Sequence, residues 1–150
     1  MPDAGDIILA ADFPAAVSDT QDTSGTTTST TYTATLTGGV ACGVVFVAPT
    51  SGRVTVLNSS RIINNGANAT YCGFSLRTGG TIGSGTVVMA EGDNRAIGHE
   101  QATNTLDRMT VSQLVTGLTP GATYNVQQLF RAVAGTGSFA NKHLSVIPTT

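Results

Sequence analysis

The sequence predicts an all-β fold, an antiparallel β-sandwich in one domain. Apolar and polar residues alternate with a period of two in many short segments, as they do in half-buried strands. Clusters of Gly, Pro and Asn separate these segments at short intervals, which is typical of sandwiches and barrels. About eight to ten strands can be counted and no segment has the period of a helix, so the pattern favours a jelly roll.

The composition indicates that part of the surface is covered in an assembly. Charged residues make up 11% of the 150-residue chain, against about 25% in a typical soluble protein. A small monomer normally keeps a more charged surface for solubility. Thr, Ser, Gly and Ala take the place of the missing charges, and we expect oligomerisation or attachment to a larger particle.

Charge and hydropathy argue against several classes of partner. The formal net charge is −2 and Lys and Arg do not cluster, which disfavours nucleic acid and anionic membranes. No apolar run approaches the roughly 20 residues of a membrane span. The first residues, MPDAGDIILAADF, carry an acid where a secretory signal has a basic residue. We therefore expect synthesis in the cytoplasm of the producing cell.

Residues 1–30 are predicted to form an N-terminal arm and a polar linker that precede a sandwich domain of residues 31–150. The arm carries one apolar cluster, Ile7, Ile8, Leu9 and Phe13. These side chains either dock on another molecule or form an edge strand on their own domain. The linker, SDTQDTSGTTTSTT, has no apolar residue to bury.

Strands are then predicted in order along the domain. The segment CGVVFVA, residues 42–48, is apolar on both faces and predicts a central strand covered on both sides. Residues 86–90 predict a short buried strand, and 95–100 a weaker one. The other predicted strands are 32–36, 53–63, 69–77, 109–115, 122–133 and 138–147.

The longest alternating segment follows a sharp turn. Pro120 and Gly121 fit the two central positions of a type II turn, which predicts a hairpin between 109–115 and 122–133. In the second strand, Tyr124, Val126, Gln128, Phe130 and Ala132 share one face. This is the more apolar face of the two, although Leu129 and Val133 lie on the other.

The residues with reactive side chains give no catalytic or metal-binding pattern. His99 and His143 lie in no local signature of a Ser or Cys nucleophile with an oriented base. Glu91, Asp93 and Asn94 do not have the spacing of a calcium loop. The Gly-rich stretch 79–85 lacks the lysine of a phosphate-binding loop. We therefore expect no enzyme activity, no catalytic residue, no metal and no cofactor.

The two cysteines, Cys42 and Cys72, are expected to be reduced. A protein that folds in the cytoplasm keeps its thiols unpaired, and buried thiols act as small apolar side chains. A disulfide between them is the alternative.

Two resemblances concern the central segment and the whole chain. GLTPGATYNVQ, residues 117–127, resembles the corner before a late strand in fibronectin type III domains, where a Tyr follows a Leu-x-Pro-Gly turn. This match covers about a tenth of the chain, and the early-strand Trp of such domains is missing.

A second resemblance covers nearly all of the chain. GDIILAADFP, TYTATLTGGVACGVVFVAPTSGRVTV and LVTGLTPGATYNVQQLFRAVAGTGSFANKHLSVIP resemble small virion proteins of tailed phages of actinobacteria, which are similar to C1q/TNF-like jelly rolls. The matching pattern lies in Phe46–Val54, Gly135–Phe139 and Leu144–Pro148. The resemblance implies a homotrimeric jelly roll without enzyme activity that serves as a head decoration protein, a minor capsid protein or a fibre tip.

Chain length favours the capsid among these roles. About thirty residues precede the first predicted strand of the domain, too few for a long trimeric stalk even at ~3.3 Å per residue. The function predicted first is therefore a decoration or cement trimer on the virion head, bound to the major capsid protein through Ile7, Ile8, Leu9 and Phe13. The alternative is a tail or fibre adhesion module that binds a host-surface glycan or protein, and a small hydrolase ranks far below both.

The predicted trimer needs an interface between copies. The aromatic residues Tyr124, Phe130 and Phe139 are candidates for it. The same three side chains equally fit the core of a single copy, and the sequence leaves both interpretations open.

Overall fold

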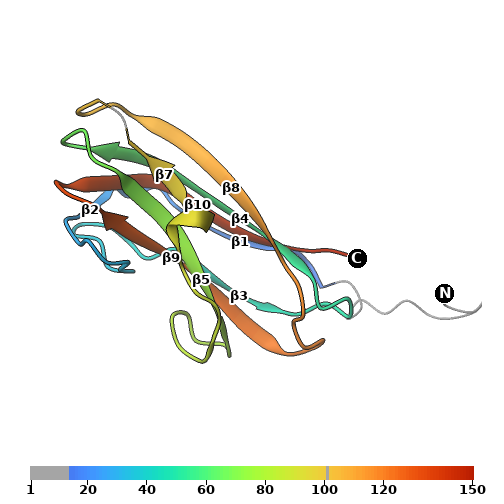
Figure 1. The fold of residues 1–150 in the computed structure, drawn as a ribbon. Helices are drawn as coiled ribbons and strands as arrows, with labels where there is room; N and C mark the ends of the chain where they lie inside the picture. Colours follow the sequence, from blue (N-terminus) through green and yellow to red (C-terminus); the bar gives the residue numbers. More distant parts are fainter. Residues whose placement is uncertain (1–13, 101) are drawn as a thin grey trace, which may run out of the picture.

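The computed structural model describes residues 14–100 and 102–150. Two antiparallel sheets face each other (Figure 1). Sheet A has the order β1-β10-β4-β8, with β2 also paired to β10, and sheet B has the order β3-β9-β5-β6, with β7 also paired to β5. The strands are β1 Val17–Gln21, β2 Gly25–Thr27, β3 Gly43–Val47, β4 Val54–Asn64, β5 Thr70–Thr78, β6 Val87–Met89, β7 Ile97–His99, β8 Asp107–Val115, β9 Thr123–Ala132 and β10 Gly137–Pro148.

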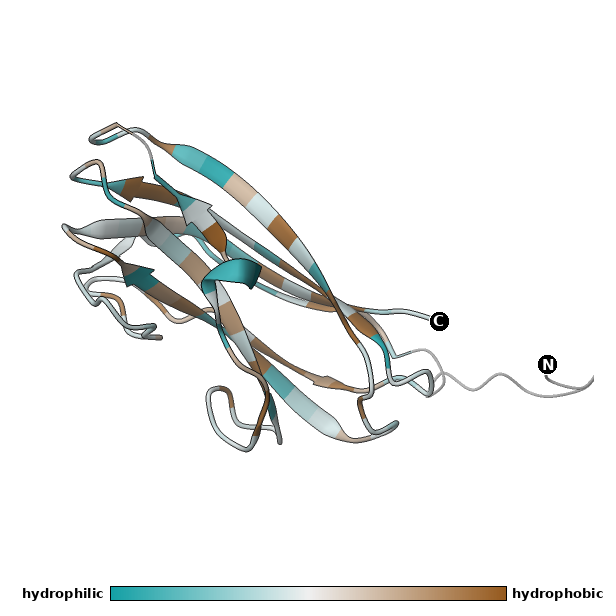
Figure 2. Cartoon of the chain, viewed as in Figure 1, coloured by the Kyte–Doolittle hydropathy of each residue, from teal (hydrophilic) through white to brown (hydrophobic). Residues whose placement is uncertain are grey.

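The topology is that of a jelly roll, as predicted. From β3 onward the chain repeatedly passes from one sheet to the other, so β8, β9 and β10 lie in sheets A, B and A. A single turn of 3-10 helix, η2 (Asp93–Arg95), interrupts the strands of the described chain and appears as a hydrophilic turn in Figure 2.

The interior consists of two apolar clusters separated by polar side chains. The larger cluster includes Phe46, Val56, Phe74, Val126 and Leu144, and the smaller one Leu36, Ile62, Cys72, Ile97, Phe130 and Phe139. Between them lie Asn58, Gln128 and Lys142, all buried. Three strands contribute to both clusters and to the polar layer, since β4, β9 and β10 each carry apolar residues on either side of a polar one.

Hydrogen bonds stabilise the polar layer. The Gln128 amide nitrogen donates to Asn58 Oδ1 at 2.6 Å and to the carbonyls of Ser59 and His143, both at 3.1 Å. The Lys142 ammonium donates to the Thr23 carbonyl at 2.7 Å, and burial lowers the pKa of this lysine. These bonds spare the donors the cost of about 1–3 kcal/mol that a buried polar group without a partner carries, whereas Gln128 Oε1 has no partner among the described residues.

A β-bulge directs Lys142 inward. The register of β10 against β4 shifts by one residue between Ala140 and His143. Asn141, at the bulge, has a φ of 45°, in the left-handed region that Asn tolerates better than most residues.

The structure corrects the predicted start of the domain. Residues 18–21 and 25–27, predicted as polar linker, lie in strands β1 and β2 of sheet A, and β1 also includes Val17, predicted as the end of the arm. β1 pairs with β10 from Val17, opposite Val146, to Gln21, opposite Lys142. Backbone pairing holds this segment on the sheet, and Val17 packs against the larger apolar cluster. Residues 1–13 of the predicted arm lie outside the described residues.

The predicted hairpin is a crossover between the sheets. β8 pairs with β4 in sheet A, whereas β9 pairs with β3 and β5 in sheet B. The Thr119–Gly121 turn therefore links the sheets, as the corner of a fibronectin type III domain does. The Tyr124 hydroxyl accepts a hydrogen bond from the Thr119 backbone N–H at 3.0 Å, which holds the turn against the start of β9.

Three strand predictions also differ from the structure. β3 is an edge strand, not a central one, and its Val45 and Val47 side chains are 37% and 47% exposed. β6 is a three-residue edge strand with Val87 and Val88 exposed, because it pairs only with one end of β5. Residues 32–36 form no strand and contact the sheets through the isolated bridge between Thr33 and Phe130.

Candidate functional site: the outer faces of the two sheets

The residues predicted from the sequence as sites fall into two groups. Ile7, Ile8, Leu9 and Phe13 lie outside the described residues. Tyr124, Phe130 and Phe139 are 6%, 0% and 0% exposed in the single chain. The rings of Phe130 and Phe139 pack at a centroid distance of 4.7 Å. These three side chains belong to the core of one copy, so they offer no surface for a subunit interface.

The cysteines are separate buried thiols, as expected. Cys42 lies in the larger apolar cluster and Cys72 in the smaller one. Burial raises the pKa of each thiol to about 12. A thiol with such a pKa stays protonated at neutral pH and is a poor nucleophile.

The two histidines make different contacts. His99 is buried, and its Nδ1 lies 3.2 Å from an Asp107 carboxylate oxygen. His143 lies on the outer face of sheet A, with Nδ1 2.9 Å from Thr20 Oγ1 and Nε2 2.6 Å from Ser145 Oγ. Ser145 and His143 thus touch, but the other ring nitrogen meets a hydroxyl where a catalytic triad has a carboxylate.

One end of the outer face of sheet B is covered by the loop of residues 79–86. Asn125, on β9, is fully buried beneath this loop. Its amide nitrogen donates to the carbonyls of Thr78, Gly79 and Ser84 at 3.3, 3.0 and 3.1 Å. Its carbonyl oxygen accepts from the Gly83 N–H at 3.0 Å. The Asn125 side chain thus binds the loop at Gly79, Gly83 and Ser84, and backbone bonds such as that from the Gly79 N–H to the Thr123 carbonyl also hold it.

The other end of that face carries a cluster of Tyr32, Tyr71, Asp93 and Arg131, which we call the sheet B clamp. Arg131 binds both carboxylate oxygens of Asp93 and donates to the Thr30 carbonyl at 3.1 Å. Its guanidinium carbon lies 4.7 Å from the Tyr71 ring centroid and 5.6 Å from that of Tyr32, distances at which cation–π attraction acts. The Tyr32 hydroxyl donates to Asp93 at 3.0 Å.

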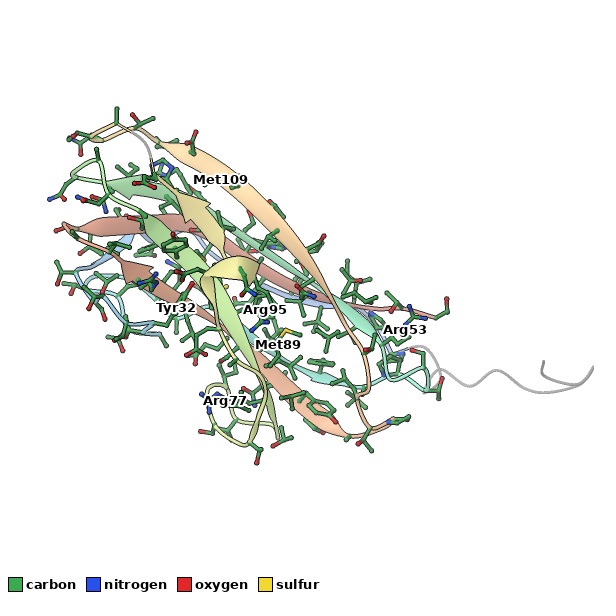
Figure 3. All side chains as sticks on the ribbon, in the orientation of Figure 1. Tyr32, Arg53, Arg77, Met89, Arg95 and Met109 are labelled. Carbon is green, nitrogen blue, oxygen red and sulfur yellow. The ribbon has the colours of Figure 1, made fainter. Side chains whose placement is uncertain are left out.

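The groups of the sheet B clamp shift one another's pKa values. Hydrogen bonds from Arg131 lower the pKa of Asp93, and those to Asp93 raise the pKa of Arg131. Burial and the neighbouring Asp93 raise the pKa of Tyr32. The Tyr32 ring lies over Gly73, where an added Cβ would approach it to 3.1 Å. The clamp therefore ties residues 30–32 and η2 to sheet B. Figure 3 labels Tyr32 beside β9.

The outer face of sheet A has a different composition. Its strand registers place mainly hydroxyl and apolar side chains outward, and no acidic one. The outward residues of its four long strands include Ser18, Thr20, Thr55, Leu57, Ser59, Arg61, Arg108, Thr110, Ser112, Leu114, His143, Ser145 and Ile147. Leu114 and Ile147 are 45% and 37% exposed.

The two ends of this face differ from each other. Leu57, Leu114 and Ile147 surround Thr55 at one end, which we call the apolar end. Arg61 and Arg108 face each other across β4 and β8 at the other end, which we call the arginine end. Arg61 lies six positions after Thr55 along β4, a length of about 20 Å.

Within residues 14–100 and 102–150, no group of three or more His, Cys, Asp or Glu side chains is arranged to hold a metal ion. The same residues contain no helix with the length and hydropathy of a membrane span.

The sheet B clamp and the arginine end were missed by the sequence prediction. Arg131 was assigned to the less apolar face of its strand, but nothing in the sequence pairs it with Asp93, 38 positions away. Arg61 and Arg108 are 47 positions apart, and only the register of β4 against β8 brings them together. The sequence signal that could have indicated these sites is a charged residue at an outward position of a predicted strand.

Comparisons with known proteins identify the fold. No family model matches the sequence, and no curated protein sequence matches it significantly. A chain of the T13 particle of infectious bursal disease virus (IBDV) has 13% sequence identity and a TM-score of 0.56, over 89% of this chain and 31% of that one. A chain of IBDV strain Gx has 10% identity and a TM-score of 0.50, over 91% and 33%.

A third solved structure is the enzymatically active domain of tailspike protein 4 from bacteriophage CBA120. It has 14% identity and a TM-score of 0.33, over 86% of this chain and 19% of that one, and this score is too low for an argument. This chain thus spans about a third of the two virus chains. At these identities the likeness concerns the jelly-roll fold alone.

Proposed function

We propose that this protein is a virion structural protein, a homotrimeric decoration or cement protein on the head of a tailed phage of actinobacteria. The observation that carries the proposal is the jelly roll itself, which matches chains from IBDV particles over most of its length. The sequence resemblance to small phage virion proteins supports the phage and the head. The low content of charged residues agrees with a chain that is covered in a particle.

The apolar end of sheet A supports the homotrimer. Leu57, Leu114 and Ile147 form an apolar patch on the outer face of sheet A, which carries no covering segment among the described residues. Burying an apolar side chain contributes about 1.5–3 kcal/mol. Closed symmetry lets each copy bury such a patch, so this end replaces Tyr124, Phe130 and Phe139 as the proposed subunit contact.

The N-terminal arm is proposed to attach each trimer to the major capsid protein. Ile7, Ile8, Leu9 and Phe13 are the docking side chains. Three arms per trimer make attachment multivalent, so weak single contacts suffice for stable binding.

Co-sedimentation with heads stripped of this protein tests the proposal. Deletion of residues 1–13 and the double substitution Ile8→Asp with Phe13→Asp are both expected to abolish head binding, because a carboxylate is costly to place in an apolar groove. Ala4→Asp adds a charge to the same segment and is the matched control, which is expected to bind. Circular dichroism and native mass spectrometry verify that each variant is a folded trimer.

The outcomes separate the proposed function from adhesion. Full head binding by the arm-deleted protein rejects the arm as the attachment. If, in addition, substitutions in the loop of residues 79–86 abolish binding to host cells, the protein is an adhesion module of the tail or fibre. A clean monomer at micromolar concentration in native mass spectrometry rejects the homotrimer.

A further inference from the structure

Some cationic side chains of the molecule have a hydrogen-bond acceptor within the chain, and others have none among the described residues. The chain has seven Lys and Arg residues. Arg131 is paired with Asp93, and Lys142, Arg53, Arg77 and Arg95 each donate to a backbone carbonyl. Arg61 and Arg108 make no side-chain hydrogen bond or ion pair with another described residue.

These two residues are also neighbours. They are directly opposite in the register of β4 and β8, and both point to the outer face of sheet A. Side chains at such positions have Cβ atoms about 4.5–5.5 Å apart, and like charges there repel each other. The Arg61 Nε is buried and lacks a hydrogen-bond partner. Two adjacent guanidinium groups therefore leave donors and positive charge uncompensated.

The carboxylates in the strands of sheet A do not point to this face. Asp19 and Asp107 are the acids in the strands of sheet A, and both are at inward positions. Asp19 accepts hydrogen bonds from Gln21 and from the Gly43 N–H, and Asp107 pairs with His99. Asp22, beyond the end of β1, accepts from Asn141.

We infer that the arginine end of sheet A binds carboxylate side chains of a protein partner. Guanidinium groups match carboxylates in a planar, two-bonded geometry, and two of them side by side neutralise an acidic surface best. The neighbouring Thr110, outward and exposed, adds a hydroxyl donor without a competing charge. The partner is an acidic patch of the capsid shell; this choice of partner, unlike the carboxylate site itself, rests on the proposed function.

The site is tested first without any virion component. The probe is the peptide hexaglutamate, titrated into the full-length protein while the Nε–Hε signals of the arginines are followed by NMR. The signals of Arg61 and Arg108 are expected to shift on binding. The variant with Arg61→Gln and Arg108→Gln is expected to bind the peptide at least about tenfold more weakly, a loss of roughly 1.4 kcal/mol.

A matched control removes the same charge elsewhere. The variant with Arg53→Gln and Arg95→Gln is expected to bind hexaglutamate with an affinity close to that of the unchanged protein. Equal weakening in both double variants overturns the site, because it shows a general effect of net charge. The inference is also overturned if deletion of residues 1–13, with no peptide added, shifts the NMR signals of Arg61 and Arg108. Such a shift would mean that aspartates of the chain itself bind the two arginines.

Stripped heads identify the partner. Head binding that is weakened about tenfold by Arg61→Gln with Arg108→Gln, with the arm intact and the control unaffected, supports the capsid shell. Unchanged head binding by this variant rejects the shell as the partner. If the unchanged protein binds hexaglutamate at the arginine end but no heads, the carboxylate site stands and the proposed function fails.

Discussion

Two segments of the chain cover parts of the outer face of sheet B, where Val45 and Val47 stay exposed, whereas the outer face of sheet A is bare among the described residues. On sheet B, Asn125 binds the 79–86 loop and the sheet B clamp binds residues 30–32 and η2. On sheet A, the outward side chains are mostly hydroxyls, a few apolar groups and two arginines without acceptors. This difference supports the proposal that partners bind to the outer face of sheet A.

This comparison predicts that equivalent substitutions affect stability on sheet B and association on sheet A. The predictions are ordered by the expected change in the free energy of unfolding.

Asn125→Ala is expected to cause the largest loss of stability. It removes four hydrogen bonds from a buried side chain and frees the 79–86 loop. Each former partner of Asn125 that stays buried without a new partner costs about 1–3 kcal/mol, and some of these partners become hydrated. The expected loss in the free energy of unfolding is therefore roughly 2–4 kcal/mol. Urea denaturation measures it, and hydrogen exchange should be faster in residues 79–86.

Thr123→Ala is the control on the same face of the same strand. Thr123 is exposed, and its replacement should change stability by less than about 0.5 kcal/mol. An equally small effect of Asn125→Ala would show that the loop does not depend on this side chain.

Arg131→Gln is expected to cost less, about 1–2 kcal/mol, because the ion pair with Asp93 is partly hydrated. The variant loses the two bonds to Asp93, the bond to Thr30 and the contact with the Tyr71 ring. Thermal unfolding measures the loss. Arg95→Gln nearby removes one bond to the Ala90 carbonyl and serves as the control; a loss as large as that of Arg131→Gln would contradict a specific role for the clamp.

Asp93 makes part of the stability depend on acid pH. Hydrogen bonds from Arg131 lower its pKa in the folded protein, and the unfolded chain titrates near the usual value of about 3.9. The stabilisation is therefore complete above pH of about 4 and is lost as pH falls through the lower pKa of the folded state. The difference in stability between the unchanged protein and Asp93→Asn should shrink as pH falls from 5 to 2. A difference that stays constant over this range would mean that the Asp93 charge contributes nothing.

The sequence allows much of the sandwich to be predicted but not the partners of its strands. Residues 53–63, 69–77 and 109–115 alternate clearly, and the corresponding strands β4, β5 and β8 have nearly these bounds. Periodicity assigns side chains to two faces and does not identify the neighbouring strand. For this reason the turn at Pro120 was predicted as a hairpin, and β3, apolar on both faces, was predicted as central although it is an edge strand.

The candidate sites were less predictable, for a related reason. Tyr124, Phe130 and Phe139 are apolar aromatic residues that fit a core or an interface equally well, and only the packing of both sheets assigns them to the core. A lysine such as Lys142 is expected at the surface from its residue type, but the bulge at Asn141 turns its side chain into the interior. The clamp and the arginine end depend on register and on loop position, which local sequence does not determine.

Leu114→Lys on sheet A is the last test and should have the smallest effect on the unfolding of a single copy. Leu114 is 45% exposed on an edge strand, and Lys is common at such positions because it prevents unwanted strand pairing. We expect a change of less than about 1 kcal/mol in the free energy of unfolding, as for most exposed positions. The proposed trimer should nevertheless dissociate, because three lysines would be brought into one apolar contact. Sedimentation velocity measures the association state.

Val133→Lys, at an equally exposed apolar residue just after β9, is the matched control and should leave the trimer intact. If Leu114→Lys remains a trimer, the apolar end of sheet A is not the subunit contact. If Val133→Lys dissociates as well, the effect comes from added charge and not from the face of sheet A.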